Sequence, residues 1–183
     1  MKMKAKLGAS LKKFMASEPL DTISVIKITK DCKVNRQTFY YHFRNLYDLL
    51  TWVFLNEKIE MPSNHELEEG ILIILRYVKH NEALITNTLA SAAKDLVREF
   101  IFNYMYNVSL AYIAKKDQNM KLTVHERKLL ARVYGAGISS SVIAWIENDL
   151  LYPEAEFVMK LVTFFKNFPL DAIKYKGEGY AKL

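Results

Sequence analysis

The residues best suited to recognition chemistry lie in the stretch 34–43, VNRQTFYYHF. On a helix of about 3.6 residues per turn, Phe39 and Phe43 share one face, and their apolar rings favour burial. The rest of the helix carries side chains of another kind: Asn35, Arg36, Gln37, Tyr40 and Tyr41. Arginine can bind guanine through two hydrogen bonds, glutamine can pair with adenine, and tyrosine can reach phosphate or pack on a thymine methyl. The stretch therefore predicts a helix face that reads nucleic acid.

The residues just before this stretch complete a helix-turn-helix. Ser24 can cap a helix over residues 25–32, followed by a tight turn at Lys33 and Val34 and a second cap at Asn35. The apolar residues of the first helix repeat at helical spacing: Val25, Ile28 and Cys32. Two short helices joined by so few residues form a unit whose second helix enters the major groove of DNA.

On these residues the chain resembles the TetR-type bacterial transcription regulators, nearest the branch that includes the activator of dihydroxyacetone-kinase operons. The resemblance covers about the first third of the chain and rests on Ser24, Val25, Ile28, Cys32, Val34, Asn35, Thr38, Phe39, Tyr40, His42, Phe43 and Leu49. It implies double-stranded DNA as partner and a set of DNA-contacting residues: Ser24, Lys27, Asn35, Arg36, Gln37, Thr38, Tyr40, Tyr41 and His42.

Three residues depart from the family pattern. Cys32 stands where alanine is usual, and Lys33 stands where the turn often has glycine, which predicts a left-handed backbone at Lys33. Leu46 stands where many members carry a lysine that contacts phosphate, so that contact is not expected here. None of the three removes the groove-facing residues.

Composition sets the class of protein. At 183 residues, half of them apolar, the chain can bury a sizeable core in one or two domains. The single cysteine excludes an internal disulfide and fits a reducing cytoplasm. The basic amino terminus lacks the apolar core of a signal peptide. The uncharged runs 100–114 and 133–146 fall short of the ~20 residues that span a bilayer, so we expect a cytoplasmic protein without a membrane partner.

The positive charge is concentrated at one end. Residues 1–56 contain ten Lys or Arg and four Asp or Glu, a net charge of +6, whereas residues 57–183 contain sixteen of each. All excess positive charge therefore lies in the segment assigned to DNA, as an electrostatic footprint should. Basic termini also serve solubility alone, and that alternative weakens beside the helix-turn-helix pattern.

The remaining pattern predicts an all-α chain of about nine helices. The first covers residues 2–16, and a fourth, capped by Asn45, covers 46–60. Further helices are expected at 67–79, 82–89, 92–116, 123–147 and from Pro153 to before Pro169, with a frayed tail from Lys174. Thr123 and Glu126 form a capping box. We place a DNA-binding domain at 1–60, with its fourth helix as a rigid connector, and an effector-binding and dimerisation domain at 61–183.

The resemblance implies a homodimer in which the last two helices pair with their copies. Small residues at 135–141 would let another helix approach closely, since glycines within a helix cost about 1 kcal/mol each and should have a use. The expected interface comprises Gly135, Ser139, Val142, Phe157, Leu161 and Phe164. Packing within one chain is the alternative.

The second domain also carries many aromatic residues on two long helices. Phe102, Tyr106 and Tyr134 could line an effector pocket with apolar walls and a few hydroxyls. More often such residues are core, and we favour core for most aromatic residues there. The effector would be a small molecule or a partner protein, and the sequence does not distinguish them.

Enzyme functions find no support in the sequence. His42, His65, His80 and His125 have no metal-ligand spacing, and no phosphate loop, nucleophile elbow or paired acid motif is present, so we expect no metal and no cofactor. Two hypotheses remain. The first is a dimeric DNA-binding regulator on a palindromic operator, and the alternative is a helical protein-interaction adaptor or co-activator with a vestigial helix-turn-helix.

Overall fold

The computed structural model describes residues 2–118, 122–148 and 153–167. Within these ranges the chain forms nine α-helices and a single turn of 3-10 helix, without a β-strand. The predicted all-α class is confirmed. The expected end of the last helix before Pro169 and the tail from Lys174 lie outside the described residues.

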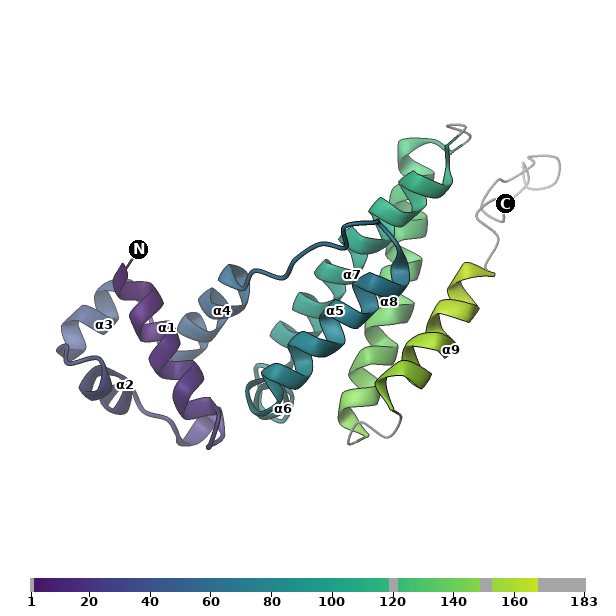
Figure 1. Ribbon diagram of the computed structural model, residues 1–183. Helices are drawn as coiled ribbons and strands as arrows, with labels where there is room; N and C mark the ends of the chain where they lie inside the picture. The colour runs from purple at the N-terminus through teal and green to yellow at the C-terminus, as the bar shows by residue number, and fades with distance from the viewer. Residues whose placement is uncertain (1, 119–121, 149–152, 168–183) are drawn as a thin grey trace, which may run out of the picture.

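The amino-terminal helices form a compact group at the left of Figure 1. Its elements are α1 (Lys2–Met15), a 3-10 turn (Leu20–Thr22), α2 (Val25–Asp31), α3 (Arg36–His42) and α4 (Leu46–Asn56). α1 packs against α2 and α4, and α2 packs against α3. α2, α3 and α4 begin where the sequence predicts, directly after their capping residues Ser24, Asn35 and Asn45.

The core of this group comes from every helix in it. Leu7, Leu11 and Met15 of α1 are fully buried, as their spacing of three and four residues predicts. They lie in one apolar cluster with residues from the other three helices: Ile28, Phe39, Leu49 and Leu50, all fully buried. Burial of this cluster fixes the directions in which α2 and α3 present their remaining faces.

The fourth helix is shorter than predicted. We expected it to reach Glu60 and to act as a rigid connector, but it ends at Asn56. Glu57 has an extended backbone, and its carboxylate accepts a hydrogen bond from Lys12 Nζ of α1 at 2.8 Å. The carbonyl of Glu60 accepts from the Tyr104 hydroxyl at 3.1 Å instead of a helical N–H. The connector is therefore an extended segment held by tertiary contacts.

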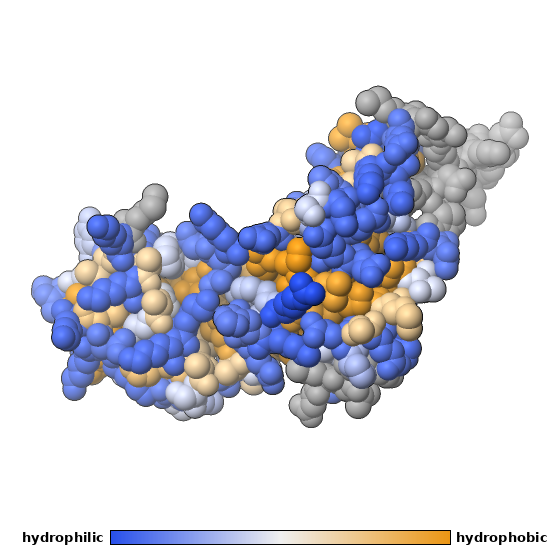
Figure 2. All heavy atoms as spheres, in the orientation of Figure 1, coloured by the Kyte–Doolittle hydropathy of each residue, from blue (hydrophilic) through white to orange (hydrophobic). Residues whose placement is uncertain are grey.

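The carboxyl-terminal helices form a second group, at the right of Figure 1. They are α5 (Leu67–His80), α6 (Glu82–Leu89), α7 (Lys94–Lys116), α8 (Val124–Glu147) and α9 (Glu154–Lys166). α7 and α8 form the most extensive helix pair, and α5 packs against both α7 and α9. Figure 2 shows apolar residues at the surface over α5 and towards α9, where a groove is lined by Leu72, Val158, Met159 and Val162.

α8 begins with the predicted capping box. The Thr123 side chain accepts from the N–H of Glu126, and the Glu126 carboxylate accepts from the N–H of Thr123. Its uncharged run is shorter than a bilayer, as expected, but the whole 24-residue helix is long and apolar enough to span one by length and composition. Since 56% of its most apolar window is buried inside the chain, packing against α7 accounts for that composition.

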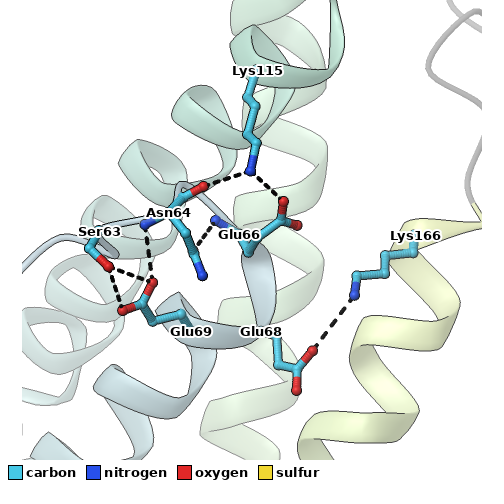
Figure 3. A network of polar contacts seen from close by, with 7 residues as sticks. All are labelled: Ser63, Asn64, Glu66, Glu68, Glu69, Lys115 and Lys166. Atoms are coloured by element: carbon cyan, nitrogen blue, oxygen red, sulfur yellow. Dashed lines mark hydrogen bonds and ion pairs between the residues drawn. The ribbon is translucent and has the colours of Figure 1, made fainter.

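The second half of the connector is fastened to the carboxyl-terminal group by polar contacts, drawn in Figure 3. Lys115 of α7 donates to the carbonyl of Asn64 at 2.8 Å and to the Glu66 carboxylate at 2.7 Å. Glu69 of α5 accepts from the Ser63 hydroxyl and the Asn64 N–H. The hydrogen bond from Lys115 lowers the pKa of the Glu66 carboxyl below its ordinary value. These contacts fix where α5 begins.

Candidate nucleic-acid interface

Local capping chemistry sets the angle between α2 and α3. The Ser24 hydroxyl caps α2 by accepting from the Lys27 N–H at 3.2 Å, and Asn35 caps α3 by accepting from the Thr38 N–H at 2.8 Å. Between them Lys33 has a φ of 53°, the predicted left-handed conformation. The turn thus takes a form that usually favours glycine, with a lysine side chain pointing to solvent.

Two aromatic rings hold α3 against the rest of the group. Phe39 is fully buried and Phe43 is 3% exposed, so the prediction that they share the inner face is confirmed. The Phe43 ring lies 6.0 Å from the ring of Trp52 on α4, and Lys4 Nζ lies 5.4 Å from its centre. α3 is therefore anchored from one side only.

The other side of α3 faces solvent. Tyr41 is 85% exposed and Tyr40 is 50% exposed, and both Arg36 and Gln37 are exposed. The Arg36 guanidinium lies 5.9 Å from the centre of the Tyr40 ring, close enough for a cation–π contact that orients it. Four side chains able to contact bases or phosphate thus project from one short, rigidly anchored helix.

Asn35, Thr38 and His42 occupy the edges of this face. The Thr38 hydroxyl donates to Asn35 Oδ1 at 2.9 Å, so the cap and the threonine hold each other in place. Thr38 and His42 are half-buried, and the His42 ring lies edge-on to Tyr41 at 5.0 Å between ring centres. These residues position their neighbours and also flank the surface available to a ligand.

Lys27 lies differently from the rest of the predicted set. Its ammonium pairs with the Glu18 carboxylate and lies 4.7 Å from the centre of the Phe14 ring. A phosphate contact from Lys27 therefore requires exchange of its internal partner, a requirement that sequence spacing does not reveal. Leu46, as expected for an apolar residue, is half-buried against the core.

Two basic residues that the sequence analysis did not single out as contacts flank α3. Lys33 precedes the helix and Arg44 follows it, and both are exposed. Their position within two or three residues of the helix ends was the available signal, because backbone-binding cations commonly lie at the margins of a groove-facing helix. They extend the positively charged surface along the direction of α3.

The residues expected to line an effector pocket lie in packed surroundings. Tyr134 is 1% exposed and donates its hydroxyl hydrogen to the carbonyl of Phe165 at 3.1 Å, and burial raises its pKa to about 12. Phe102 and Tyr106 are half-buried and their rings contact each other at 6.2 Å. A cleft of about 480 Å³ between α4 and α7 contains none of these three residues.

The expected dimer residues divide into two groups. Gly135, Ser139 and Val142 are buried within the chain, and a Cβ at Gly135 would lie 3.0 Å from the backbone of Tyr106 on α7. The glycine admits α7, not a second chain, so these three residues are placed where the intrachain alternative put them. On α9, Phe164 is 65% exposed, Leu161 is half-buried and Phe157 stacks on Trp145 at 5.4 Å.

The structure thus joins a two-helix unit, with one anchored and one solvated face, to an all-helical second group. Residues 65–167 match the family model TetR_C_8, the carboxyl-terminal region of transcriptional regulators. The chain is 34% identical over 163 residues to the HTH-type dhaKLM operon transcriptional activator DhaS of Lactococcus lactis subsp. lactis (strain IL1403), covering 81% of this chain and 83% of that protein. The chain belongs to the TetR-type transcriptional regulators.

Solved structures agree on the fold. The dihydroxyacetone kinase operon activator DhaS superposes with a TM-score of 0.68 at 22% identity, over 89% of this chain and 93% of that one. The fatty acid degradation regulator FadR from Bacillus halodurans gives a TM-score of 0.59 at 15% identity, over 90% and 98%. At such identities the likeness concerns architecture alone. The relatives are regulators of transcription and not enzymes, and this chain is a regulator near the DhaS branch.

Proposed function

We propose that this protein binds a palindromic operator in double-stranded DNA as a homodimer, with α3 of each subunit in the major groove. The observation that carries the proposal is the division of α3 between a fully buried Phe39 and a Tyr41 that is 85% exposed. Residues 1–60 form the DNA-binding domain, and residues 61–183 form the domain that dimerises and binds an effector. As a regulator of transcription without an expected membrane partner, it works in the cytoplasm.

The exposed residues of α3 make two kinds of contact in the proposed complex, to base edges and to phosphates. Arg36, Gln37 and Tyr41 reach base edges, whereas Thr38, Tyr40 and His42 lie towards the phosphates. Ser24 and Asn35 hold helix starts and keep hydroxyl or amide hydrogens for phosphate contact. Lys27 joins them only after release from Glu18. The net charge of +6 on residues 1–56 supplies the salt-dependent part of the affinity.

The dimer surface that we propose lies one residue along α8 from the expected one. Its members are exposed and share one stripe at spacings of three and four: Leu129, Val133, Ala136, Ser140 and Ala144. On α9, Phe164 is 65% exposed and Leu161 is half-buried, and both remain part of the proposed interface. Small residues at its centre allow two α8 helices to approach closely. Two recognition helices about 34 Å apart would then read one palindrome.

Control by an effector follows from population shift. A small molecule or partner protein that binds one dimer geometry better than another shifts the separation of the two α3 helices, by as much as its affinities differ. Operator affinity then changes without any contact between effector and DNA. The extended connector after Asn56 and the α1–α6 and α4–α7 contacts join the two groups of helices.

The test is a band-shift titration against the DNA upstream of the protein's own gene. Arg36→Ala should weaken binding by about 1–3 kcal/mol, as for loss of a base contact, with the fold preserved. Tyr41→Ala should act in the same direction. Arg76→Ala removes an equally exposed arginine from α5 and serves as the matched control. Unchanged binding by both α3 variants would contradict the assignment of the recognition helix.

The salt dependence of DNA binding distinguishes a regulator from the alternative, an adaptor. A regulator that neutralises several phosphates loses affinity steeply as salt rises, whereas an adaptor with a vestigial helix-turn-helix binds DNA weakly at any salt concentration. The half-buried Leu46, where a phosphate contact would stand, is the observation that favours the adaptor. The confinement of the excess positive charge to residues 1–56 favours the regulator.

A further inference from the structure

A cleft of about 480 Å³ lies where the two groups of helices meet, a volume in the range of small-molecule sites. One wall is α7, the other is the end of α4, and the first half of the connector closes one side. The lining residues are Thr51, Phe54 and Leu55 of α4, Glu57, Ile59 and Met61 of the connector, and Leu96, Glu99, Phe100, Asn103, Tyr104 and Asn107 of α7.

The base of the cleft is an aromatic row that crosses three helices. The Phe100 ring lies 5.4 Å from that of Phe54 on α4 and 5.2 Å from that of Tyr77 on α5. The Tyr77 hydroxyl is buried beside the Glu57 carboxylate, and it makes no hydrogen bond of standard geometry among the described residues. Burial and then the charge of Glu57 raise the pKa of Tyr77 above its ordinary value. A flat apolar surface next to a polar edge suits a ligand that has both kinds of surface.

The residues that could contact a ligand are available. Leu55 is 79% exposed and Met61 is 46% exposed, although both are large and apolar. Glu99, Asn103 and Asn107 follow one another every four residues on α7, all exposed, and the structure gives their side chains no hydrogen bond or ion pair among the residues it describes. The cleft therefore offers apolar walls with an acidic and two amide groups at its margin.

The charge of the cleft selects the sign of the ligand. The acidic residues in the lining are Glu57 and Glu99, and no Lys, Arg or His is among the lining residues. Among the nearby cations, Lys12 pairs with the lining residue Glu57 and Arg98 pairs with Glu147. Lys58 lies between the lining residues Glu57 and Ile59 but is exposed and is not itself part of the lining. Glu57 is neutralised by Lys12, and Glu99 remains as the acid without a counter-ion in the described structure.

We propose that this interdomain cleft binds a small organic cation, an amine on an aromatic or aliphatic body, with the body on Phe54 and Phe100 and the ammonium at Glu99. The proposal rests on the proposed effector control and names its site and ligand class. A ligand held there contacts α4 and α7 at once. Since α4 follows α3 directly, such a ligand favours one placement of the recognition helix relative to the second domain.

Three probes that share a naphthylmethyl body and differ in charge test the site in the full-length protein without DNA. They are 1-naphthylmethylamine, 1-naphthalenemethanol and 1-naphthaleneacetate, titrated by calorimetry at neutral pH. The cation should bind most tightly and the anion least. Binding of the anion as tightly as the cation would overturn the proposal, and so would the absence of binding by the cation.

Two variants locate the binding. Glu99→Gln should weaken binding of the cation about two- to fivefold, as for loss of a partly exposed ion pair. It should leave the affinity for the neutral alcohol unchanged. Asp95→Asn removes an exposed carboxylate from the same helix outside the lining, one that pairs with Arg98 at 3.8 Å, and it should change the binding of neither probe. Asn103→Trp should fill the cleft and abolish binding of cation and alcohol alike, with thermal melting to verify folding. Undiminished binding by the Asn103→Trp protein would place the probes elsewhere and overturn the assignment.

A second measurement separates the cleft from the regulatory function. The cation at saturating concentration should shift operator affinity in the parent protein, and Asn103→Trp should abolish that shift. A calorimetric site with no operator binding at all would leave the cleft standing and contradict the proposed function. Operator binding that the occupied cleft does not change would contradict the assignment of the cleft as the effector site.

Discussion

Asn87 of α6 donates a hydrogen bond from Nδ2 to the main-chain carbonyl of Met15, the last residue of α1, at 2.8 Å. The carbonyls of a last helical turn lack partners within their own helix, so this amide satisfies one that would otherwise be left open. It joins the first helix of the DNA-binding group to the second group. A second hydrogen bond, from Lys12 of α1 to the Glu57 carboxylate of the connector, holds α1 to the segment after α4.

Asn87→Ala should lower the free energy of unfolding by about 0.5–1.5 kcal/mol, because a part-buried carbonyl loses its partner. Urea denaturation of the full chain measures the change. Asn56→Ala is the matched control, since Asn56 Nδ2 donates at the same 2.8 Å to the carbonyl of Trp52 at an exposed site within its own helix. Equal losses for the two variants would show that the α1–α6 contact adds nothing.

Gly70 of α5 packs directly against Val108 of α7. A Cβ at this position would lie 2.4 Å from Val108 Cγ1 and 3.0 Å from Cγ2, and Val108 is fully buried. Gly70→Ala should therefore destabilise the protein by about 1–3 kcal/mol, although alanine favours a helix. The stiff, branched valine cannot turn aside, so the helices must separate.

A double-mutant cycle with Val108→Ala checks this account by thermal or urea unfolding. Removal of the two methyl groups opens the space that the new Cβ needs. The double variant should lose less stability than the sum of the two single changes. Strict additivity would mean that the clash with Val108 is not the reason for the loss.

Local chemistry could be predicted from the sequence, and contacts between distant segments could not. Ser24, Asn35 and Thr123 cap the helices that they were expected to cap, and Lys33 adopts the expected left-handed turn. Each of these depends on residues three or four positions away.

The features that the sequence did not predict all depend on contacts with residues distant in the chain. The fourth helix stops at Asn56 because Lys12 and Tyr104 engage the residues after it. Lys27 pairs with Glu18 although its side chain is 40% exposed, and Gly135 lies against Tyr106 of the same chain. The spacing in α8 predicted a close helix approach correctly, but spacing alone cannot say which of two neighbouring faces meets α7. The cleft lies between two segments far apart in the chain, 51–61 and 96–107, and has no local signature.

Asp31 at the end of α2 should titrate below its ordinary value. Lys13 Nζ donates to Oδ1 at 2.5 Å and the Ser10 hydroxyl donates to Oδ2 at 2.8 Å, and these bonds lower the pKa of the carboxyl from 3.8. A lowered folded-state pKa means that the contribution to stability is present above the unfolded-state pKa. It is lost as the pH falls through the folded-state value.

Carbon-13 NMR titration of the carboxyl measures this shift. Lys13→Gln should raise the pKa of Asp31 towards its ordinary value, because the Lys13 hydrogen bond is the largest cause. Lys30→Gln removes the charge of an adjacent exposed lysine that makes no bond to Asp31 in the described structure, and it should leave the pKa nearly unchanged. Equal pKa shifts in both variants would mean that nearby positive charge, and not the Lys13 hydrogen bond, lowers the pKa of Asp31.

The exposed stripe of α8 leads to the last prediction. Ser140 lies at its centre and is exposed, whereas its neighbour Ser139 is 6% exposed and faces the chain's own core. Ser140→Arg should yield a folded monomer by sedimentation, since a charged side chain cannot be buried between two close helices without a partner. Ala114→Arg adds the same side chain to an exposed site on α7 and should leave the dimer intact.

Loss of the dimer in the Ser140→Arg protein should also lower its affinity for the operator. A single recognition helix loses the gain of two linked contacts, about a hundredfold or more, although no residue of α3 has changed. A Ser140→Arg protein that remains dimeric would show that the subunits meet elsewhere. A monomer that binds the operator as tightly as the parent would instead refute the requirement for two copies. The prediction therefore tests the register of α8 and the palindromic reading independently, because sedimentation answers the first and the band shift answers the second.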